Sequence, residues 1–414
     1  MTAGEKKLHV VRAIVYVIAF AFFTYLFYLE CTGVLVSDMP NHVKRALTNS
    51  AHDYTILSPL IIFFHSIGGM VGVSVMFSLI EVATIYVSER LMRKLAPNAS
   101  IAVIFVCAVC CNVAIAVYCP LIHPYLTRGL SVGNQWHNST FLGMRLVGLA
   151  VIWFYLRFVG YFESKSHVLD GIGFTVSVIL SAAVKPSLIL SMGPALAVIC
   201  VYDLVKYGKG TLRRSLVMAA AFVLAIALIV PLQASALYGA GSRSGLGIGF
   251  FSVWRHFNSC IPLGMLQSWA FPLIVLCYCG SIRFKDRNYQ LTWMVFLVSL
   301  FVYAFLKETG YRKYHGNFAW GLNFADYYLM ITAICAYLKT RYDKAAALFG
   351  KNKPNTATEI VNAGVSLEPT HGPAFFIRFA NSKAFDICAI TLFALHTISG
   401  FISFGSILMG NGYA

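Results

Sequence analysis

The stretch that decides the fold is VVRAIVYVIAFAFFTYLFYLECTGVL, residues 10–35. This apolar run is longer than the roughly 20 residues that an α-helix needs to cross the hydrocarbon core of a bilayer. It is also too long for the core of a signal peptide, and no small-x-small cleavage pattern follows it closely. We therefore expect it to remain in the protein as a first membrane span.

Apolar runs of comparable length recur along the whole chain. Of its 414 residues, 58% are hydrophobic and 12% are charged, whereas charged residues make up about a quarter of an ordinary soluble protein. Helices satisfy their own backbone hydrogen bonds inside a bilayer, and the runs have the length of helices. The sequence thus predicts an all-α, multi-pass membrane protein with about 11 transmembrane helices, at approximately 10–34, 57–87, 100–119, 140–160, 169–184, 187–205, 214–236, 261–281, 290–306, 322–340 and 384–408.

The basic residues are spread over the chain and predict its orientation. The formal net charge is +16, but the Lys and Arg residues punctuate the apolar runs and form no single patch, which argues against a nucleic-acid partner. With the N-terminus in the cytoplasm, 22 of the 32 Lys and Arg residues fall on the cytoplasmic side, in agreement with the positive-inside rule. We expect a protein of the plasma (inner) membrane with an extracytoplasmic C-terminus.

One long polar stretch divides the chain near its C-terminus. Residues 342–383 contain Asn352-Lys353-Pro354-Asn355 and Pro369-Thr370-His371-Gly372-Pro373, which are typical of a linker. The predicted organisation is a transmembrane core over 1–341, a cytoplasmic linker over 342–383 and an appended C-terminal transmembrane helix over 384–414.

Two short extracytoplasmic segments place polar side chains where the chain leaves the membrane. Asp38 and His42 lie four residues apart after the first span. Asp38 can instead simply cap a helix that starts a few residues later. Lys185 lies in the connection 184–187 between two short spans, so we expect it in a recess; the alternative is a lysine that snorkels from a tight turn.

Two further loops on the same side are rich in polar residues. The loop 132–140 holds Trp136, a residue typical of the membrane interface, beside donors and acceptors for hydroxyl groups such as His137 and Asn138. The glycine-rich loop 237–260 carries Arg243, which either closes over a substrate or belongs to a plain flexible loop.

The densest polar cluster runs from Lys307 to Gly321. Arg312 and Lys313 suit a phosphate, and the aromatic residues around them suit the faces of sugar rings. Glu308 also has the helical i,i+4 spacing for an ion pair with Arg312. A carboxylate, cations, aromatic rings and amides on one side predict an outward-facing pocket that transfers a sugar from a lipid phosphate to a hydroxyl.

The strings that carry these residues resemble a known family. They are Ser37-Asp38-Met39-Pro40-Asn41-His42, Trp136-His137-Asn138-Ser139-Thr140, Lys185-Pro186-Ser187 and His315-Gly316-Asn317-Phe318-Ala319-Trp320-Gly321. They are similar to strings in uncharacterised bacterial surface-polysaccharide membrane proteins. With the many spans and a carboxylate directly after the first one, residues 1–341 resemble the GT-C type of integral-membrane glycosyltransferases, which use a polyprenyl-phosphate-linked sugar donor.

The resemblance implies a role for each candidate residue. Asp38 would be the general base, and His42 would orient or assist it. The donor phosphate would be held by Lys185, Arg243, Arg312 and Lys313. The sugar or the acceptor, a hydroxyl of a cell-surface glycan or polysaccharide, would contact Trp136, His137, Asn138, Glu308, Tyr314, His315 and Asn317. Several GT-C families have an acidic pair or a metal-binding Asp-x-Asp where this chain has one acidic residue, so the resemblance leaves a divalent metal cofactor open.

Two other functions fit the same features, and a non-catalytic assembly subunit is a third alternative. An O-antigen or capsule polymerase or ligase would use a diphosphate-linked donor, with the outer Arg and His residues and no carboxylate base. A lipid-linked sugar flippase or transporter would need ionisable groups near the bilayer midplane. Glu81 and Asp326 are the candidates for such groups, and the predicted boundaries place both near span ends.

Overall fold

A computed structural model describes residues 3–48, 55–162, 168–238, 244–278, 285–349 and 383–411. These residues are mostly helical, with one pair of short strands among them. Within them, six stretches are long and apolar enough to cross a membrane: Glu5–Cys31, Leu57–Leu95, Ser139–Phe158, Ser187–Ser235, Arg287–Phe305 and Lys383–Leu408. The all-α membrane class is therefore confirmed, whereas the number of eleven spans stays a prediction.

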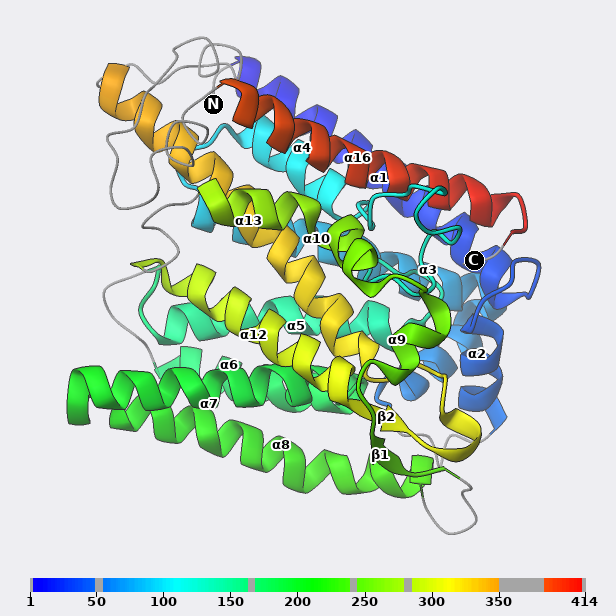
Figure 1. Ribbon diagram of the computed structural model, residues 1–414. Helices are drawn as coiled ribbons and strands as arrows, with labels where there is room; N and C mark the ends of the chain where they lie inside the picture. Colours follow the sequence, from blue (N-terminus) through cyan, green and yellow to red (C-terminus); the bar gives the residue numbers. More distant parts are fainter. Residues whose placement is uncertain are drawn as a thin grey trace.

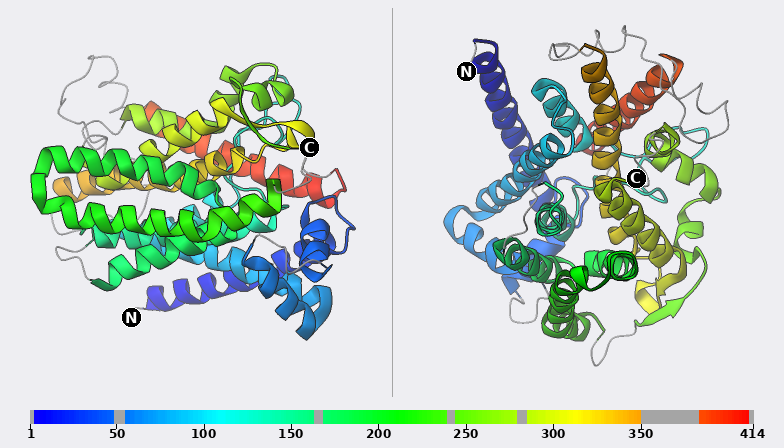
Figure 2. Two further views of the ribbon diagram at one scale, coloured as in Figure 1. Left: turned by 90° about the horizontal axis from the view of Figure 1, so that it is seen from below. Right: turned by 90° about the vertical axis from the view of Figure 1, so that its left-hand side faces the viewer.

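The long helices lie side by side between two ends of the molecule (Figure 1). They are α1 (Ala3–Cys31), α3 (Leu57–Leu95), α5 (Ser139–Phe158), α6 (Val168–Val184), α7 (Ser187–Tyr207), α8 (Leu212–Tyr238), α10 (Ile261–Tyr278), α12 (Arg287–Phe305), α13 (Ala319–Phe349) and α16 (Lys383–Leu408). We call the end at which α1 finishes the Asp38 end, and the opposite end the Lys339 end. Figure 2 shows that α7 and α8 form one side of the bundle, away from α1 and α16.

Two short helices and the two paired strands lie at the Asp38 end (Figure 1). They are α2 (Met39–Thr48), α9 (Ser252–Phe257), β1 (Leu246–Ile248) and β2 (Leu306–Glu308). The two strands pair antiparallel, with Leu246 opposite Glu308. This pairing joins the glycine-rich loop 237–260 to the start of the polar cluster that follows α12, so segments about sixty residues apart in the sequence meet at one surface.

The predicted span 57–87 is a longer helix with a break. α3 has non-helical backbone angles at Gly68 (φ −142°, ψ 19°) and Gly69 (φ 56°, ψ −142°). A positive φ is accessible to glycine at no steric cost, which explains why the break falls at this pair. Residues 57–67 therefore form a separate helical segment before the break, and the second part of α3 continues to Leu95 at the Lys339 end.

The predicted span 100–119 is wrong in its second half. α4 (Ile101–Cys111) stops there, and residues 112–138 continue without regular helix or strand. Their backbone N–H groups form hydrogen bonds with other parts of the protein. The N–H of Ile115 donates to the backbone carbonyl of His396 (3.1 Å), and the N–H of Val117 donates to that of Gln267 (2.9 Å). Irregular backbone is tolerated at membrane depth only where protein or water satisfies its polar groups, and here backbone carbonyls and buried side chains of other helices do so.

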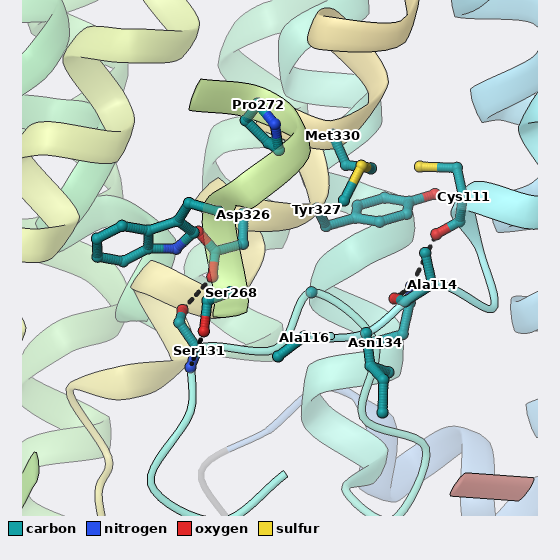
Figure 3. A pocket seen from close by; sticks show the side chains of 13 residues that line it. Cys111, Ala114, Ala116, Ser131, Asn134, Ser268, Pro272, Asp326, Tyr327 and Met330 are labelled. Carbon is teal, nitrogen blue, oxygen red and sulfur yellow. Dashed lines mark hydrogen bonds between the residues drawn. The ribbon is translucent and has the colours of Figure 1, made fainter. Parts of the chain in front are cut away.

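One set of those side chains surrounds Asp326 of α13 (Figure 3). Asp326, which is buried, accepts a hydrogen bond from the hydroxyl of Ser131. The N–H of Ser131 donates to Ser268 Oγ of α10 (3.1 Å), and the N–H of Val132 donates to Asn323 Oδ1 (3.2 Å). The irregular segment is thus pinned to α10 and α13.

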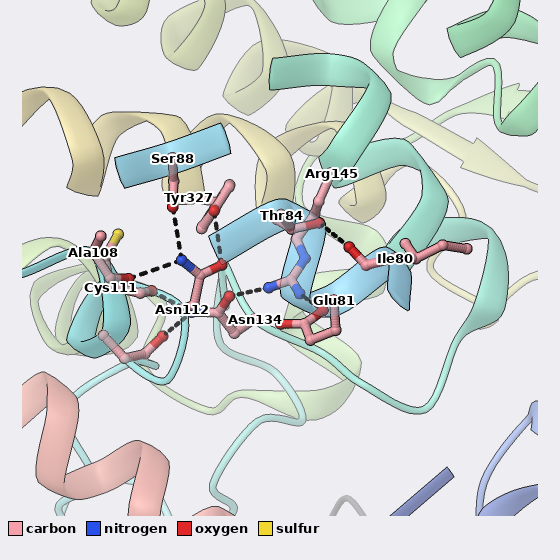
Figure 4. A network of polar contacts seen from close by, with 11 residues as sticks. Ile80, Glu81, Thr84, Ser88, Ala108, Cys111, Asn112, Asn134, Arg145 and Tyr327 are labelled. Carbon is pink, nitrogen blue, oxygen red and sulfur yellow. Dashed lines mark hydrogen bonds and ion pairs between the residues drawn. The ribbon is translucent and has the colours of Figure 1, made fainter. Parts of the chain in front are cut away.

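A second set centres on a buried ion pair (Figure 4). Arg145 of α5 donates to Glu81 of α3 and to Asn134 of the irregular segment, and all three side chains are buried. Asn134 in turn donates to the carbonyls of Cys111 (2.7 Å) and Ala114 (2.6 Å). The prediction that Glu81 lies near a span end is wrong, because α3 runs on to Leu95.

The last helix contacts the core at several depths. The ring of Phe404 stacks on Trp136 with centroids 3.9 Å apart, and Ser399 Oγ accepts from the N–H of Tyr118 (2.9 Å). α16 therefore covers the irregular segment. The predicted linker starts inside α13, which extends to Phe349; residues 350–382 lie outside the described residues.

Candidate functional site

Asp38 lies on the turn between α1 and α2. The hydroxyl of Ser37 accepts a hydrogen bond from the N–H of Met39 (3.1 Å), so Ser37 provides the side-chain cap at the start of α2. The backbone carbonyl of Asp38 accepts from the N–H of His42 (3.1 Å). The carboxylate of Asp38, with its side chain 52% exposed, accepts from Asn138 Nδ2 (3.3 Å). The Asp38 side chain is thus directed toward another loop, which a capping role alone does not require.

Asn138 connects that carboxylate to a buried lysine. Its Oδ1 caps α5 by accepting from the N–H of Phe141 (3.0 Å), and it also accepts from Lys185 Nζ (3.3 Å). Lys185 Nζ donates in addition to Thr140 Oγ1 (2.8 Å). One amide therefore holds Asp38 on its nitrogen side and Lys185 on its oxygen side.

Lys185 is buried at the head of α7. It is 8% exposed, and its Nζ lies 4.4 Å from the ring centroid of Trp320, within the range of a cation–π contact. Burial lowers the pKa of Lys185 to about 7; the charge of Asp38 opposes this effect, and that of Arg312 adds to it. Near neutral pH the amine is accordingly poised between its charged and neutral forms, and it lies in a recess as its short connection predicts.

His137 completes this group. Its Nε2 is 3.9 Å from Asp38 Oδ2, and its ring centroid lies 5.9 Å from that of Trp320. Burial lowers the pKa of His137 to about 4, and the charge of Asp38 only partly offsets this, while Lys185 and His42 lower it further. His137 is therefore a neutral imidazole at neutral pH, able to donate one hydrogen bond and accept one.

The cluster after α12 is organised by a buried carboxylate. Glu308 in β2 is 2% exposed. Its Oε1 accepts from Arg312 Nε (2.7 Å), and its Oε2 accepts from Asn317 Nδ2 (2.6 Å). The i,i+4 ion pair weighed from the sequence is thus present. Glu308 holds Arg312 and Asn317 in place, and it makes these contacts from a position beneath the surface.

Arg312, Asn317 and Lys185 line one end of a cavity of about 710 Å³ between α7 and α8. The rest of its wall is mainly apolar, with Leu190, Pro194, Leu196, Phe222, Val223 and Ile226 among its residues. The cavity continues along α7 as far as Cys200 and reaches Ser215 on α8. At the 1.5 Å rise of an α-helix, the stretch from Lys185 to Cys200 is about 22 Å long. We call this cavity the α7–α8 groove.

Some predicted residues lie apart from the groove. Tyr314 stacks on His256 of α9 with ring centroids 3.8 Å apart, and Lys313 Nζ lies 4.9 Å from the Tyr314 ring centroid. His315 contacts Tyr311 on the same exposed turn, with centroids 5.0 Å apart. Lys313, Tyr314 and His315 are exposed and do not line the groove, so we assign them no place there.

Two more predicted residues need separate comment. Trp136 is fully buried against Phe404 of α16, where its ring has no exposed face to offer a sugar. We assign it to the packing of the last helix. Arg243 lies outside the described residues.

Two further residues contact the Lys185 ammonium. Thr140 is absent from the sequence-based list, and Trp320 is one of the aromatic residues of the cluster Lys307–Gly321 that the sequence suggests for the face of a sugar ring. No feature of the sequence predicts the α7–α8 groove, because an apolar wall that lines a cavity and an apolar wall that faces lipid have the same composition.

Among the described residues no group of three or more His, Cys, Asp or Glu side chains converges in a way that could hold a metal ion. Asp38 has the imidazole of His137 and the amide of Asn138 beside it. Comparison of the chain with protein-family models, with curated proteins and with solved structures finds no match.

Proposed function

We propose that the protein is a membrane glycosyltransferase of the GT-C type that moves a sugar from a polyprenyl-phosphate donor to an acceptor hydroxyl on the extracytoplasmic face of the plasma membrane. The observation that supports this most is the α7–α8 groove. It combines an apolar wall with Lys185 and Arg312 at one end, and Asn138 links that end to the Asp38 carboxylate.

The groove has the chemistry of a lipid phosphate. An isoprenoid chain lies along the apolar wall and gains free energy in proportion to the area removed from water. Its phosphate contacts Arg312, which Glu308 orients. It also contacts Lys185, because an anion beside this buried amine favours the protonated, positively charged form. Charge-assisted hydrogen bonds of this kind are about twice as strong as neutral ones.

The chemical step uses Asp38 as the general base. The carboxylate takes the proton of the acceptor hydroxyl while the hydroxyl oxygen forms a bond to the anomeric carbon of the donor sugar. The bond from that carbon to the phosphate oxygen breaks, and the lipid phosphate leaves with the electron pair. Lys185 and Arg312 stabilise the charge that develops on the leaving phosphate.

The acceptor approaches from the exposed side of Asp38. About half of the Asp38 side chain is accessible, whereas the groove lies on the other side of Asn138. His137, neutral at neutral pH, and the amide of Asn317 can hydrogen-bond hydroxyl groups of either sugar. A cell-surface glycan or polysaccharide is the proposed acceptor.

The Asp38→Asn substitution tests the base. We expect transfer to be lost while the protein still inserts and unfolds at the wild-type temperature, because a half-exposed side chain with one long hydrogen bond contributes little to stability. Transfer would be followed by mass spectrometry of product formed from a polyprenyl-phosphate sugar by the purified protein in lipid nanodiscs. Retained transfer in this variant would remove Asp38 from the chemistry.

Arg312→Ala tests the phosphate site, with Lys313→Ala as its matched control. The two residues are adjacent and carry the same charge, but only Arg312 lines the groove. We expect Arg312→Ala to weaken the binding of a polyprenyl phosphate in a direct titration, by about 10-fold or more. Equal affinities of the two variants would show that Arg312 does not bind the phosphate and has only a structural role.

A lipid-linked sugar transporter is the second candidate, favoured by the length of the groove. Ser215 and Met218 line both the groove and a cavity at the Lys339 end, so the apolar path continues toward the other membrane surface. Lipid-linked intermediates from cells that lack the protein separate the functions. A missing single-sugar decoration supports transfer, accumulation of unpolymerised repeat units supports a polymerase, and donor retained on the cytoplasmic side supports transport.

A further inference from the structure

Two adjoining cavities open at the Lys339 end, opposite to the candidate active site. One, of about 650 Å³, lies between α7, α8 and the start of α12. The other, of about 610 Å³, lies between the end of α3, the start of α12 and α13. Tyr161 and Lys285 line both cavities, so the two form one depression, which we call the basic basin.

The basin carries a large excess of positive charge. Its cations are Lys94, Lys206, Arg214, Lys285, Arg287 and Lys339, and its carboxylates are Asp203 and Asp286. Both carboxylates are engaged: Asp203 with Arg287, and Asp286 with Lys339 (3.2 Å) and the Tyr161 hydroxyl (2.7 Å). Within the described part of the chain, the remaining four cations have no carboxylate partner.

The shape of the basin separates it from an ordinary basic membrane surface. Orientation in the membrane requires only that Lys and Arg lie in the loops. Here Arg214 is half-buried, and its guanidinium donates to the carbonyl of Val159 (3.1 Å), while Arg287 is held by Asp203. A concave site lined by one sign of charge focuses the electrostatic potential and raises the local concentration of anions.

The basin also joins an apolar path. Ser215 and Met218 line both the basin and the α7–α8 groove, at the end of the groove farthest from Lys185. A ligand with a phosphate in the basin therefore has an apolar wall directly beside its headgroup. This neighbourhood suits a phosphate that is attached to a hydrocarbon chain better than it suits a free phosphate.

We propose that the basic basin binds the phosphate group of an anionic phospholipid at the membrane surface opposite to Asp38, with an acyl chain entering between α7 and α8 at Ser215 and Met218. The phosphate is held by Arg214 and Lys285, neither of which has a carboxylate partner in the described structure. The proposal depends on no feature of the Asp38 end.

The double variant Arg214→Ala/Lys285→Ala tests the site in the full-length protein. Its matched control is Lys209→Ala/Arg213→Ala, which removes one Lys and one Arg from the same surface at exposed positions that do not line the basin. Native mass spectrometry would measure the binding of phosphatidylglycerol to each variant against phosphatidylcholine. The contribution of basic residues at a membrane surface predicts a loss of about 30-fold for two charges.

Parallel arms identify the source of the phosphate. Inorganic phosphate and glycerol phosphate are titrated against the same variants, with thermal unfolding in neutral lipid as the check on folding. Tight binding of phosphatidylglycerol with a selective loss in Arg214→Ala/Lys285→Ala supports the proposal. Equal lipid binding by both double variants would overturn it, and so would binding of inorganic phosphate as tight as that of the lipid.

Discussion

The donor site proposed at Lys185 is tested most sharply by the pH dependence of donor binding. The pKa of this buried amine is lowered to about 7, and only the ammonium form can pair with a phosphate. In the free protein the protonated fraction falls from about one half at pH 7 to about 1% at pH 9. Because apparent affinity falls with the fraction of protein in the ammonium form, we expect donor affinity to decrease over this interval. The decrease is about 50-fold at most, since Arg312 and the apolar wall still contact the donor when the amine is neutral.

A phosphodiester analogue that cannot transfer its sugar is the right probe, because its charge is constant over the range. Binding to the purified protein in nanodiscs would be titrated at intervals from pH 6.5 to 9. Lys185→Arg is the matched control, since a guanidinium stays charged throughout and should give affinities that change little with pH. His137, whose pKa is lowered to about 4 by burial, is neutral across the whole range and adds no slope.

Protein stability gives an independent readout of the same group. The folded pKa of Lys185 lies below the unfolded value of 10.5, so the unfolded chain binds more protons between pH 7 and pH 10.5 and stability rises with pH in that window. At pH 7 the buried amine costs about 4 kcal/mol. Lys185→Met should therefore raise the unfolding temperature at pH 7 while weakening donor binding.

A wild-type affinity for the donor analogue that is flat from pH 7 to 9 would refute this account of Lys185. An equal pH dependence of the affinity in Lys185→Arg would refute it as well.

Two further predictions concern the fold. Arg145→Met leaves Glu81 buried without its partner and should lower stability by about 3–5 kcal/mol in chemical unfolding, whereas the pair Glu81→Gln/Arg145→Met should recover part of the loss; a loss under about 1 kcal/mol in the single variant would contradict the buried ion pair. Gly400→Ala should destabilise the docking of α16 by about 1–3 kcal/mol, because the added Cβ would overlap the backbone of Val113, whereas Gly405→Ala on the same helix has open space and should be neutral. Equal melting temperatures of the two glycine variants would show that α16 does not lie as described.

The positions of most helices follow from the sequence alone. The predicted spans 140–160 and 384–408 correspond to α5 (Ser139–Phe158) and α16 (Lys383–Leu408) within two residues at each end. Such segments are predictable because the signal is local: an apolar run of sufficient length has no other stable state in a bilayer. The clustering of polar loops at one end follows in the same way from the alternation of the spans.

The tertiary structure decided which of the polar residues meet. Asp38, Asn138 and Lys185 are brought together by hydrogen bonds across three loops, whereas Lys313, beside Arg312 in the chain, lies on the exposed side of its turn. The irregular path after α4 is equally invisible in the sequence, since residues 112–119 are apolar enough to continue the helix. The composition of a segment indicates how favourable its transfer out of water is. It does not indicate whether lipid, a cavity or another part of the protein then surrounds the segment. The choice between lipid, cavity and protein is made only when distant segments pack, and it is this choice that defines the groove and its polar head.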